Sequence, residues 1–191
     1  MPQFQFDRVL PVQGDVTNLQ FPDKQFDVVF CAEVLEHIPA LQKACSEISR
    51  VARHAIVIGV PYLQDTRVGR TTCNRCGRTN PPWGHVNIFD ERKIGNLFPE
   101  WQNVKTSFVG STNDRTNPIS TWLMDFAGNP YRVSGQDEPC IHCSKQMSPP
   151  ISRSFSQKFI AAAALKLNWL HSSFNPTHPN WIHILLQKIS S

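Results

Sequence analysis

The chain has 191 residues, of which 40% are hydrophobic and 18% are charged, and its formal net charge is +4. This length allows one folded domain with an insertion, and the composition is that of a globular chain. The longest apolar run, residues 159–165, is much shorter than the ~20 residues that cross a bilayer. Because residues 1–8 also lack a secretory signal pattern, we expect a cytoplasmic protein without transmembrane segments, and not a secreted disulfide scaffold.

A strand–helix–strand unit is predicted in the first part of the chain. Residues 9–15 resemble a short strand that ends in a Gly-Asp turn. Residues 27–32, after Asp27, and residues 55–60 are continuous apolar runs, as expected of strands buried on both faces of a parallel sheet. Between them, apolar residues of 39–53 recur at spacings of three and four, which indicates a helix. A strand, a helix and a strand in this order form a βαβ unit with a right-handed crossover.

Two stretches rich in Pro, Gly and Asn, residues 62–89 and 111–150, indicate long loops in the second part of the chain. The other elements predicted there are, in order, a helix at 90–98 with Asp90 as its N-cap, a strand at 104–110, a helical piece near 119–126, a helix at 154–170 and a final strand at 181–189. The first three of these elements lie between or within the two loop stretches.

Four of the six cysteines form two CxxC pairs, Cys73/Cys76 and Cys140/Cys143. In a chain without a secretory signal, such pairs favour a metal over disulfides, and four thiolates are the ligands of a structural zinc site. The strands before the two loops are expected to run parallel, so both loops leave one edge of the sheet. We therefore predict one zinc ion that clamps both loops, with His85 and His142 as alternative ligands.

The alternative interpretation of these pairs is a set of reduced thiols or a redox pair. The other two cysteines, Cys31 and Cys45, lie in apolar surroundings and are expected to be core residues.

Residues 14–39 read Gly-Asp-Val-Thr-Asn-Leu-Gln-Phe-Pro-Asp-Lys-Gln-Phe-Asp-Val-Val-Phe-Cys-Ala-Glu-Val-Leu-Glu-His-Ile-Pro. Residues 48–61 continue with the end of a helix, a strand and Gly-Val-Pro. This combination resembles the middle of a class I S-adenosylmethionine-dependent methyltransferase of type 11. The resemblance implies an α/β fold with a Rossmann-like sheet, into which the cysteine loops are inserted, and S-adenosylmethionine as cofactor.

The resemblance also implies cofactor-binding residues. In the family, the residue that matches Asp15 hydrogen-bonds the adenine amino group, and the residue that matches Val16 packs on the ring. The segment that matches Cys31 to Glu33 lies against the cofactor. These positions are at strand ends, where ligands of open α/β sheets bind. The alternative is that Asp15 is an ordinary turn residue and that Glu33 and Glu36 belong to a solvated helical turn.

Two family features are not found in the sequence: the Gly-rich turn at the first strand and the acidic residue that holds the ribose. The chain therefore resembles a member truncated at its N-terminus, with a sheet incomplete at that end and weak cofactor binding. On this interpretation residues 1–110 are a partial core, residues 111–180 are an insertion with the second CxxC pair and a helix, and residues 181–191 are the core's last, antiparallel strand. The first CxxC loop, 62–89, interrupts the partial core.

A second metal site is suggested by Glu33, Glu36 and His37, whose spacing places them on one face of a helix, together with His85. In some members of the family that this chain resembles, including ubiquinone-pathway O-methyltransferases and the plant small-RNA terminal 2′-O-methyltransferase, such a set holds a divalent cation. Alternatively, His37, assisted by Glu36, is a general base on an acceptor hydroxyl. The plainest alternative is that these side chains have no catalytic role.

The function predicted from these observations is methyl transfer from S-adenosylmethionine to an oxygen of a small-molecule or glycan acceptor. Arginines crowd the first cysteine loop and favour an anionic acceptor. The alternatives are a non-catalytic, truncated methyltransferase-like binding module and a zinc-dependent nucleic-acid-binding protein. Nucleic acid is not expected, because only Trp83 lies near the arginines. The apolar helix at 154–170 suggests peripheral membrane contact, with core packing as the alternative.

Overall fold

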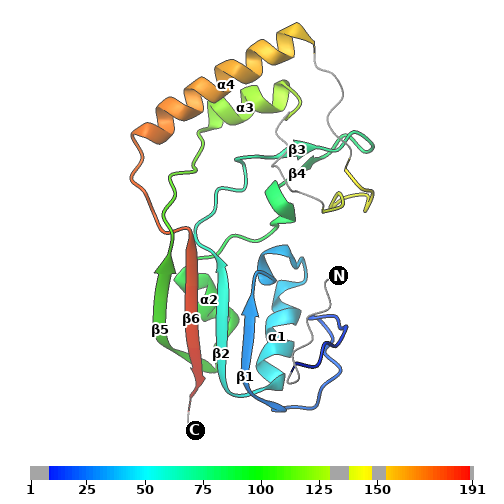
Figure 1. The fold of residues 1–191 in the computed structure, drawn as a ribbon, viewed down its shortest axis with the longest axis vertical. Helices are drawn as coiled ribbons and strands as arrows, with labels where there is room; N and C mark the ends of the chain where they lie inside the picture. The colour runs from blue at the N-terminus through cyan, green and yellow to red at the C-terminus, as the bar shows by residue number, and fades with distance from the viewer. Residues whose placement is uncertain (1–8, 130–137, 148–153, 190–191) are drawn as a thin grey trace.

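The computed structural model describes residues 9–129, 138–147 and 154–189. Figure 1 shows a sheet at one end of the molecule, a pair of helices at the other end, and the small hairpin of β3 (Thr71–Thr72) and β4 (Thr79–Asn80) between them. The α/β fold expected from the sequence is confirmed, and the long axis of the molecule runs from the sheet to the helix pair.

The sheet has four strands in the order β1-β2-β6-β5. β1 (Phe26–Ala32) pairs parallel with β2 (Ala52–Pro61), as the βαβ unit predicts. β6 (Trp181–Lys188) lies antiparallel between β2 and β5 (Trp101–Val109), so β5 runs parallel to β1 and β2. The carboxyl ends of β1, β2 and β5 therefore share one edge, and the predicted antiparallel last strand is confirmed.

Two helices contribute to the core against this sheet. α1 (Leu41–Val51) buries the apolar positions that recur at helical spacing, and α2 (Glu91–Leu97) contributes the buried Ile94. Asp90 caps α2, because its Oδ1 accepts a hydrogen bond of 2.7 Å from the backbone N–H of Lys93. The central strands supply the other half of the core, with Ile56, Ile58, Ile182, Ile184 and Leu186.

Two predictions about the first strands are wrong. Residues 9–14 form no strand, and Asp15 makes only an isolated bridge with Asn18. β1 is not buried on both faces, since Val28 and Phe30 are 56% and 69% exposed. The physical reason is the same in both cases: an apolar run becomes a buried strand only where a neighbour pairs with it or covers it, and β1 is the edge of the described sheet.

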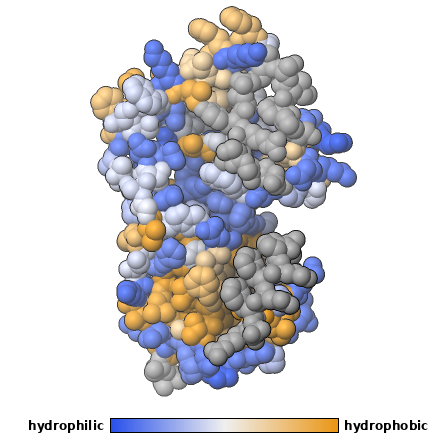
Figure 2. Space-filling model, viewed as in Figure 1, coloured by the Kyte–Doolittle hydropathy of each residue, from blue (hydrophilic) through white to orange (hydrophobic). Residues whose placement is uncertain are grey.

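The helix pair consists of α3 (Pro118–Phe126) and α4 (Phe155–Ser173), which pack against each other. Ser154 caps α4 in a reciprocal arrangement with Gln157. Figure 2 shows a hydrophilic band across the middle of the molecule and apolar surface over the sheet half. Several aromatic side chains of α3 and α4 are exposed, including Trp122 and Trp169. No helix of the described residues is long and apolar enough to span a membrane, and peripheral membrane contact stays a prediction.

The side chain of Arg50 fastens the loop before β1 to α1. Its Nη1 donates to the carbonyl of Phe21 at 2.7 Å, and its Nη2 donates to the carbonyl of Leu19 at 2.9 Å. The same guanidinium pairs with Asp23 and Glu47, each at 2.8 Å. Arg50 lowers the pKa of Glu47 to about 2, so this carboxylate is ionised in the folded chain at neutral pH.

We expect Arg50→Met to lower the free energy of unfolding by about 1–2 kcal/mol, because the variant loses hydrogen bonds to two main-chain carbonyls. Urea denaturation followed by circular dichroism measures this change. Arg92→Met, at an exposed position of α2, is the matched control and should shift the midpoint little. Equal effects of the two substitutions would show that the loop does not depend on Arg50.

Candidate functional site

The chain turns sharply after β1, at the carboxyl edge of the sheet. Glu33 has a left-handed backbone (φ 58°), and its N–H donates to the carbonyl of Gly59 on β2 at 3.0 Å. Residues Leu35–His37 then form a single 3-10 turn, η1. The predicted helical face of Glu33, Glu36 and His37 is therefore wrong, because a left-handed residue cannot belong to a right-handed helix. Glu33 is exposed and separate from the other two side chains.

Glu36, His37 and His85 form a compact cluster at this edge. One ligand atom of each lies within 4.8 Å of the others. The two imidazole rings meet edge to face, with centroids 4.7 Å apart. The backbone explains the meeting: the carbonyl of Glu36 accepts hydrogen bonds from the N–H groups of Val86 (2.8 Å) and Asn87 (3.1 Å), which brings the segment around His85 against η1.

The Glu36 side chain is fully buried, and neither carboxylate oxygen has a hydrogen-bond partner among the described residues. Burial raises the pKa of this carboxyl, and the polar backbone groups of Glu36 and Val34 and the charge of His37 oppose the shift. A buried carboxylate without a partner costs stability. Such an arrangement is typical of a site whose partner is a proton, a cation or a substrate group.

His85 is neutral and oriented. Its Nδ1 lies 2.6 Å from Oε1 of Gln64, an oxygen that can only accept, so Nδ1 carries the proton and Nε2 keeps its lone pair. Burial, together with the charge of His37, lowers the pKa of His85 to about 4. A carboxylate and two imidazoles at this spacing can hold a divalent cation or relay a proton.

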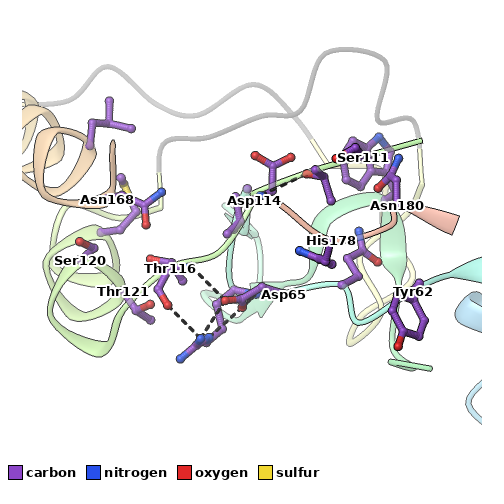
Figure 3. A pocket seen from close by; sticks show the side chains of 18 residues that line it. Tyr62, Asp65, Ser111, Asp114, Thr116, Ser120, Thr121, Asn168, His178 and Asn180 are labelled. Atoms are coloured by element: carbon purple, nitrogen blue, oxygen red, sulfur yellow. Dashed lines mark hydrogen bonds and ion pairs between the residues drawn. The ribbon is translucent and has the colours of Figure 1, made fainter. Parts of the chain in front are cut away.

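A cavity of about 610 Å³ lies beside this cluster, between the sheet edge and the helix pair. Gln64 and Trp83 line it and also contact His85, so the cavity and the cluster share a wall. Figure 3 shows polar side chains around the cavity, including Ser111, Asp114 and Asn168. Sequence analysis did not find this cavity, because its lining comes from loops, from α3 and from α4, which are far apart in the chain.

One wall of the cavity is held by an ion pair. Asp65 binds Arg67 with two hydrogen bonds of 2.8 Å and accepts the backbone N–H of Thr116 at 3.0 Å (Figure 3). Arg67 also donates to the carbonyl of Thr116 at 3.1 Å. The segment that follows β2 is thereby joined to the segment that precedes α3. Arg67 is thus neutralised, so it does not by itself make the cavity a site for anions.

The structure brings the four cysteines of the CxxC pairs together. Their sulfur atoms all lie within 4.8 Å of one another. Cys31 and Cys45 stay outside this group, in the core of the sheet half. The convergence of the four CxxC cysteines was predicted from the shared sheet edge and is confirmed. The metal itself stays a prediction.

The residues predicted to bind the cofactor lie apart from the cavity lining. Asp15 is exposed, and its Oδ1 accepts hydrogen bonds from the backbone N–H (2.8 Å) and the hydroxyl (2.9 Å) of Thr17, which lower the pKa of Asp15. Val16 packs in part against the core, and Cys31 is buried there. Their contacts with S-adenosylmethionine, like that of Glu33, stay predictions.

Residues 3–56 match the family model described as "Methyltransferase domain". This match agrees with the resemblance to S-adenosylmethionine-dependent methyltransferases that the sequence motifs indicate. The sterol 24-C-methyltransferase of Yarrowia lipolytica is 43% identical to this chain over 54 residues, which are 28% of this chain and 14% of that enzyme. Sterol methyltransferase-like 2 of Botryococcus braunii is 32% identical over 103 residues, which are 54% of this chain and 24% of that protein.

The matches thus span a quarter or less of these relatives' length. Among solved structures, an S-adenosylmethionine-dependent methyltransferase from Archaeoglobus fulgidus superposes with a TM-score of 0.45 and 14% identity, over 93% of this chain and 66% of that one. The resemblance of this chain to methyltransferases therefore rests on the matched segment.

Proposed function

We propose that the protein transfers the methyl group of S-adenosylmethionine to a hydroxyl oxygen of a polar small molecule or glycan. The observation that carries this proposal is the buried, unpartnered carboxylate of Glu36 beside two imidazoles, next to a cavity with a mixed polar and apolar lining. The matched methyltransferase segment supports the methyl donor. The matched segment does not favour the alternative of a nucleic-acid-binding protein.

The reaction requires a new bond between the acceptor oxygen and the methyl carbon while the bond from that carbon to sulfur breaks. The acceptor hydroxyl loses its proton, and His37 is the base that receives it. Glu36, within 4.8 Å, stabilises the charge that His37 then carries. His85 is a poor base, because burial lowers its pKa to about 4, but its free Nε2 can accept a hydrogen bond and orient the hydroxyl.

The same residues fit a divalent cation. The fit rests on the uncompensated Glu36 carboxylate, on Nε2 of His85 and on the nearby ring of His37. When bound, such an ion would polarise the acceptor oxygen and favour its ionised form. Glu33, which was predicted to be a fourth ligand, is not in this group.

A second candidate acceptor is a sterol carbon, because the relatives are named sterol methyltransferases. The cavity lining is mixed, because apolar side chains such as Val68, Met124 and Leu165 lie among polar ones, so a sterol could fill part of it. A sterol ring system would leave the polar lining without hydrogen-bond partners, which costs binding energy.

The test is a methyl-transfer assay with labelled S-adenosylmethionine and three acceptor classes: hydroxylated small molecules, glycans and sterols. We expect label in a methyl ether of one of the first two classes, and its loss in His37→Gln. His54→Gln, at an exposed position of β2, is the matched control. Label on a sterol carbon would overturn the oxygen acceptor. Cofactor binding by calorimetry without any labelled product would favour the non-catalytic binding module.

A further inference from the structure

The first cysteine loop folds into a tight turn around its leading sulfur. The N–H of Cys73 donates to the carbonyl of Arg78 at 2.9 Å, and the N–H of Gly77 donates to the carbonyl of Cys73 at 2.9 Å. The N–H of Arg75 points at Sγ of Cys73, 3.4 Å away. Gly77 has a left-handed backbone (φ 71°), which closes the turn. Backbone donors aimed at a sulfur favour its thiolate form.

The second cysteine loop repeats this turn bond for bond. The N–H of Cys140 donates to the carbonyl of Lys145 at 2.9 Å, and the N–H of Ser144 donates to the carbonyl of Cys140 at 2.8 Å. The N–H of His142 lies 3.4 Å from Sγ of Cys140. Ser144 adopts the left-handed conformation (φ 55°), although it is not a glycine. Two unrelated stretches of chain thus have the same turn, each presenting two sulfurs.

The four sulfurs have the spacing of a metal tetrahedron. Sγ of Cys73 lies 3.9 Å from Sγ of Cys143, and Sγ of Cys76 lies 3.7 Å from Sγ of Cys140. A disulfide needs about 2.05 Å, so neither pair is bonded. A zinc ion with bonds of about 2.3 Å to four sulfurs requires edges of about 3.8 Å. Soft thiolates in a tetrahedron select zinc over the hard cations that oxygen ligands bind.

We propose that Cys73, Cys76, Cys140 and Cys143 bind one structural Zn²⁺. Four protein ligands leave no open coordination position, so the ion is not a catalyst. Among the described residues, the buried apolar cluster between the two loops is small and consists of Cys73, Cys140 and Met147. Because so small a core cannot stabilise a module, metal binding supplies the free energy that orders it.

The two cysteine loops, residues 71–80 and 138–147, are here called the zinc module. This module also adjoins the candidate site. Hydrogen bonds from Ile141 to Asn80 (2.9 Å) and between His142 and Thr79 (3.1 Å) connect its two halves. A Cβ at Gly84, next to His85, would lie 3.6 Å from Cγ of Glu138 and 3.8 Å from Nδ1 of His37.

Glu138 has a buried carboxylate oxygen without a hydrogen-bond partner among the described residues. Glu138 thus lies near Gly84, the residue before His85. The zinc site does not rest on the proposed function.

The test measures zinc in the full chain, purified under reducing conditions, by plasma mass spectrometry. We expect one zinc ion per chain, and none in Cys140→Ser or in Cys76→Ser, which alters the exposed cysteine. His85→Gln and Cys31→Ala are the controls and should keep the zinc. If His85→Gln lost the zinc and Cys140→Ser kept it, the ion would lie at the cluster of Glu36, His37 and His85, and the proposal would be overturned. A parent chain without zinc would also overturn it.

Hydrogen exchange distinguishes local unfolding of the two cysteine loops from a failure of the whole chain to fold. It also does not depend on methyl transfer. On removal of zinc by a chelator, amides of residues 71–80 and 138–147 should lose protection, while those of β2 and β6 keep theirs. Uniform loss or no change would contradict a local structural role. A zinc-bound chain that transfers no methyl group would refute the proposed function and leave the zinc site standing.

Discussion

Glu36→Gln is expected to abolish methyl transfer and, at the same time, to stabilise the chain. The Glu36 carboxylate is fully buried and has no hydrogen-bond partner among the described residues. Removing its charge removes a desolvation cost, and we expect the free energy of unfolding at pH 7 to rise by about 1–2 kcal/mol. Activity should fall about 100-fold or more, as is usual when acid–base catalysis is lost.

Urea denaturation and the labelled-methyl assay measure the two effects on the same protein. Glu33→Gln is the matched control, since Glu33 is exposed three residues away, and it should change stability by less than about 0.5 kcal/mol. A Glu36→Gln variant that is less stable than the parent chain would show that the carboxylate has a partner in the folded protein. A variant that keeps its activity would remove Glu36 from the mechanism.

Ile184→Ala is expected to cause the largest loss of stability, about 2–5 kcal/mol. Ile184 is 1% exposed in the middle of β6. It faces Ile58 of β2 and Thr106 of β5 in the register of the sheet. Shortening it leaves a cavity at the strand that joins the two halves of the sheet, and neighbouring side chains cannot collapse into it without moving a strand.

The measurement is the urea midpoint of the full chain, with an unchanged slope as the sign that the unfolded surface is the same. Val28→Ala is the matched control, because it also removes methyl groups from a sheet residue but at a position that is 56% exposed. We expect the control to cost less than about 1 kcal/mol. Similar losses in both variants would contradict the burial pattern of the sheet.

Local signals were sufficient for most elements of the fold. The apolar runs, the spacing in α1 and the Asp90 cap depend on nearest neighbours along the chain, and all were predicted. The meeting of the four cysteines was also predicted, because parallel strands send their following loops to one edge. The resemblance to methyltransferases was visible in the order of motifs between Gly14 and Pro61.

Other features depend on partners far away in the chain. Residues 9–14 have the composition of a strand, but the described sheet provides no neighbour for their backbone. Glu33 has the spacing for a ligand, yet a hydrogen bond to Gly59 and a left-handed turn remove it from Glu36. Spacing along a chain predicts a shared face only where the backbone conformation is regular.

By itself, then, the sequence determined the βαβ unit, the edge at which the site lies and the residue types that gather there. Tertiary structure alone decided the cavity, the pairing of Gln64 with His85 and the burial of Glu36. The physical reason is that the burial of a side chain and its hydrogen-bond partners depend on two segments that meet in the fold. Neither segment determines them alone. The segment around Val86, 50 positions later, donates hydrogen bonds to the carbonyl of Glu36, so the surroundings of this acid include residues that its local sequence does not contain.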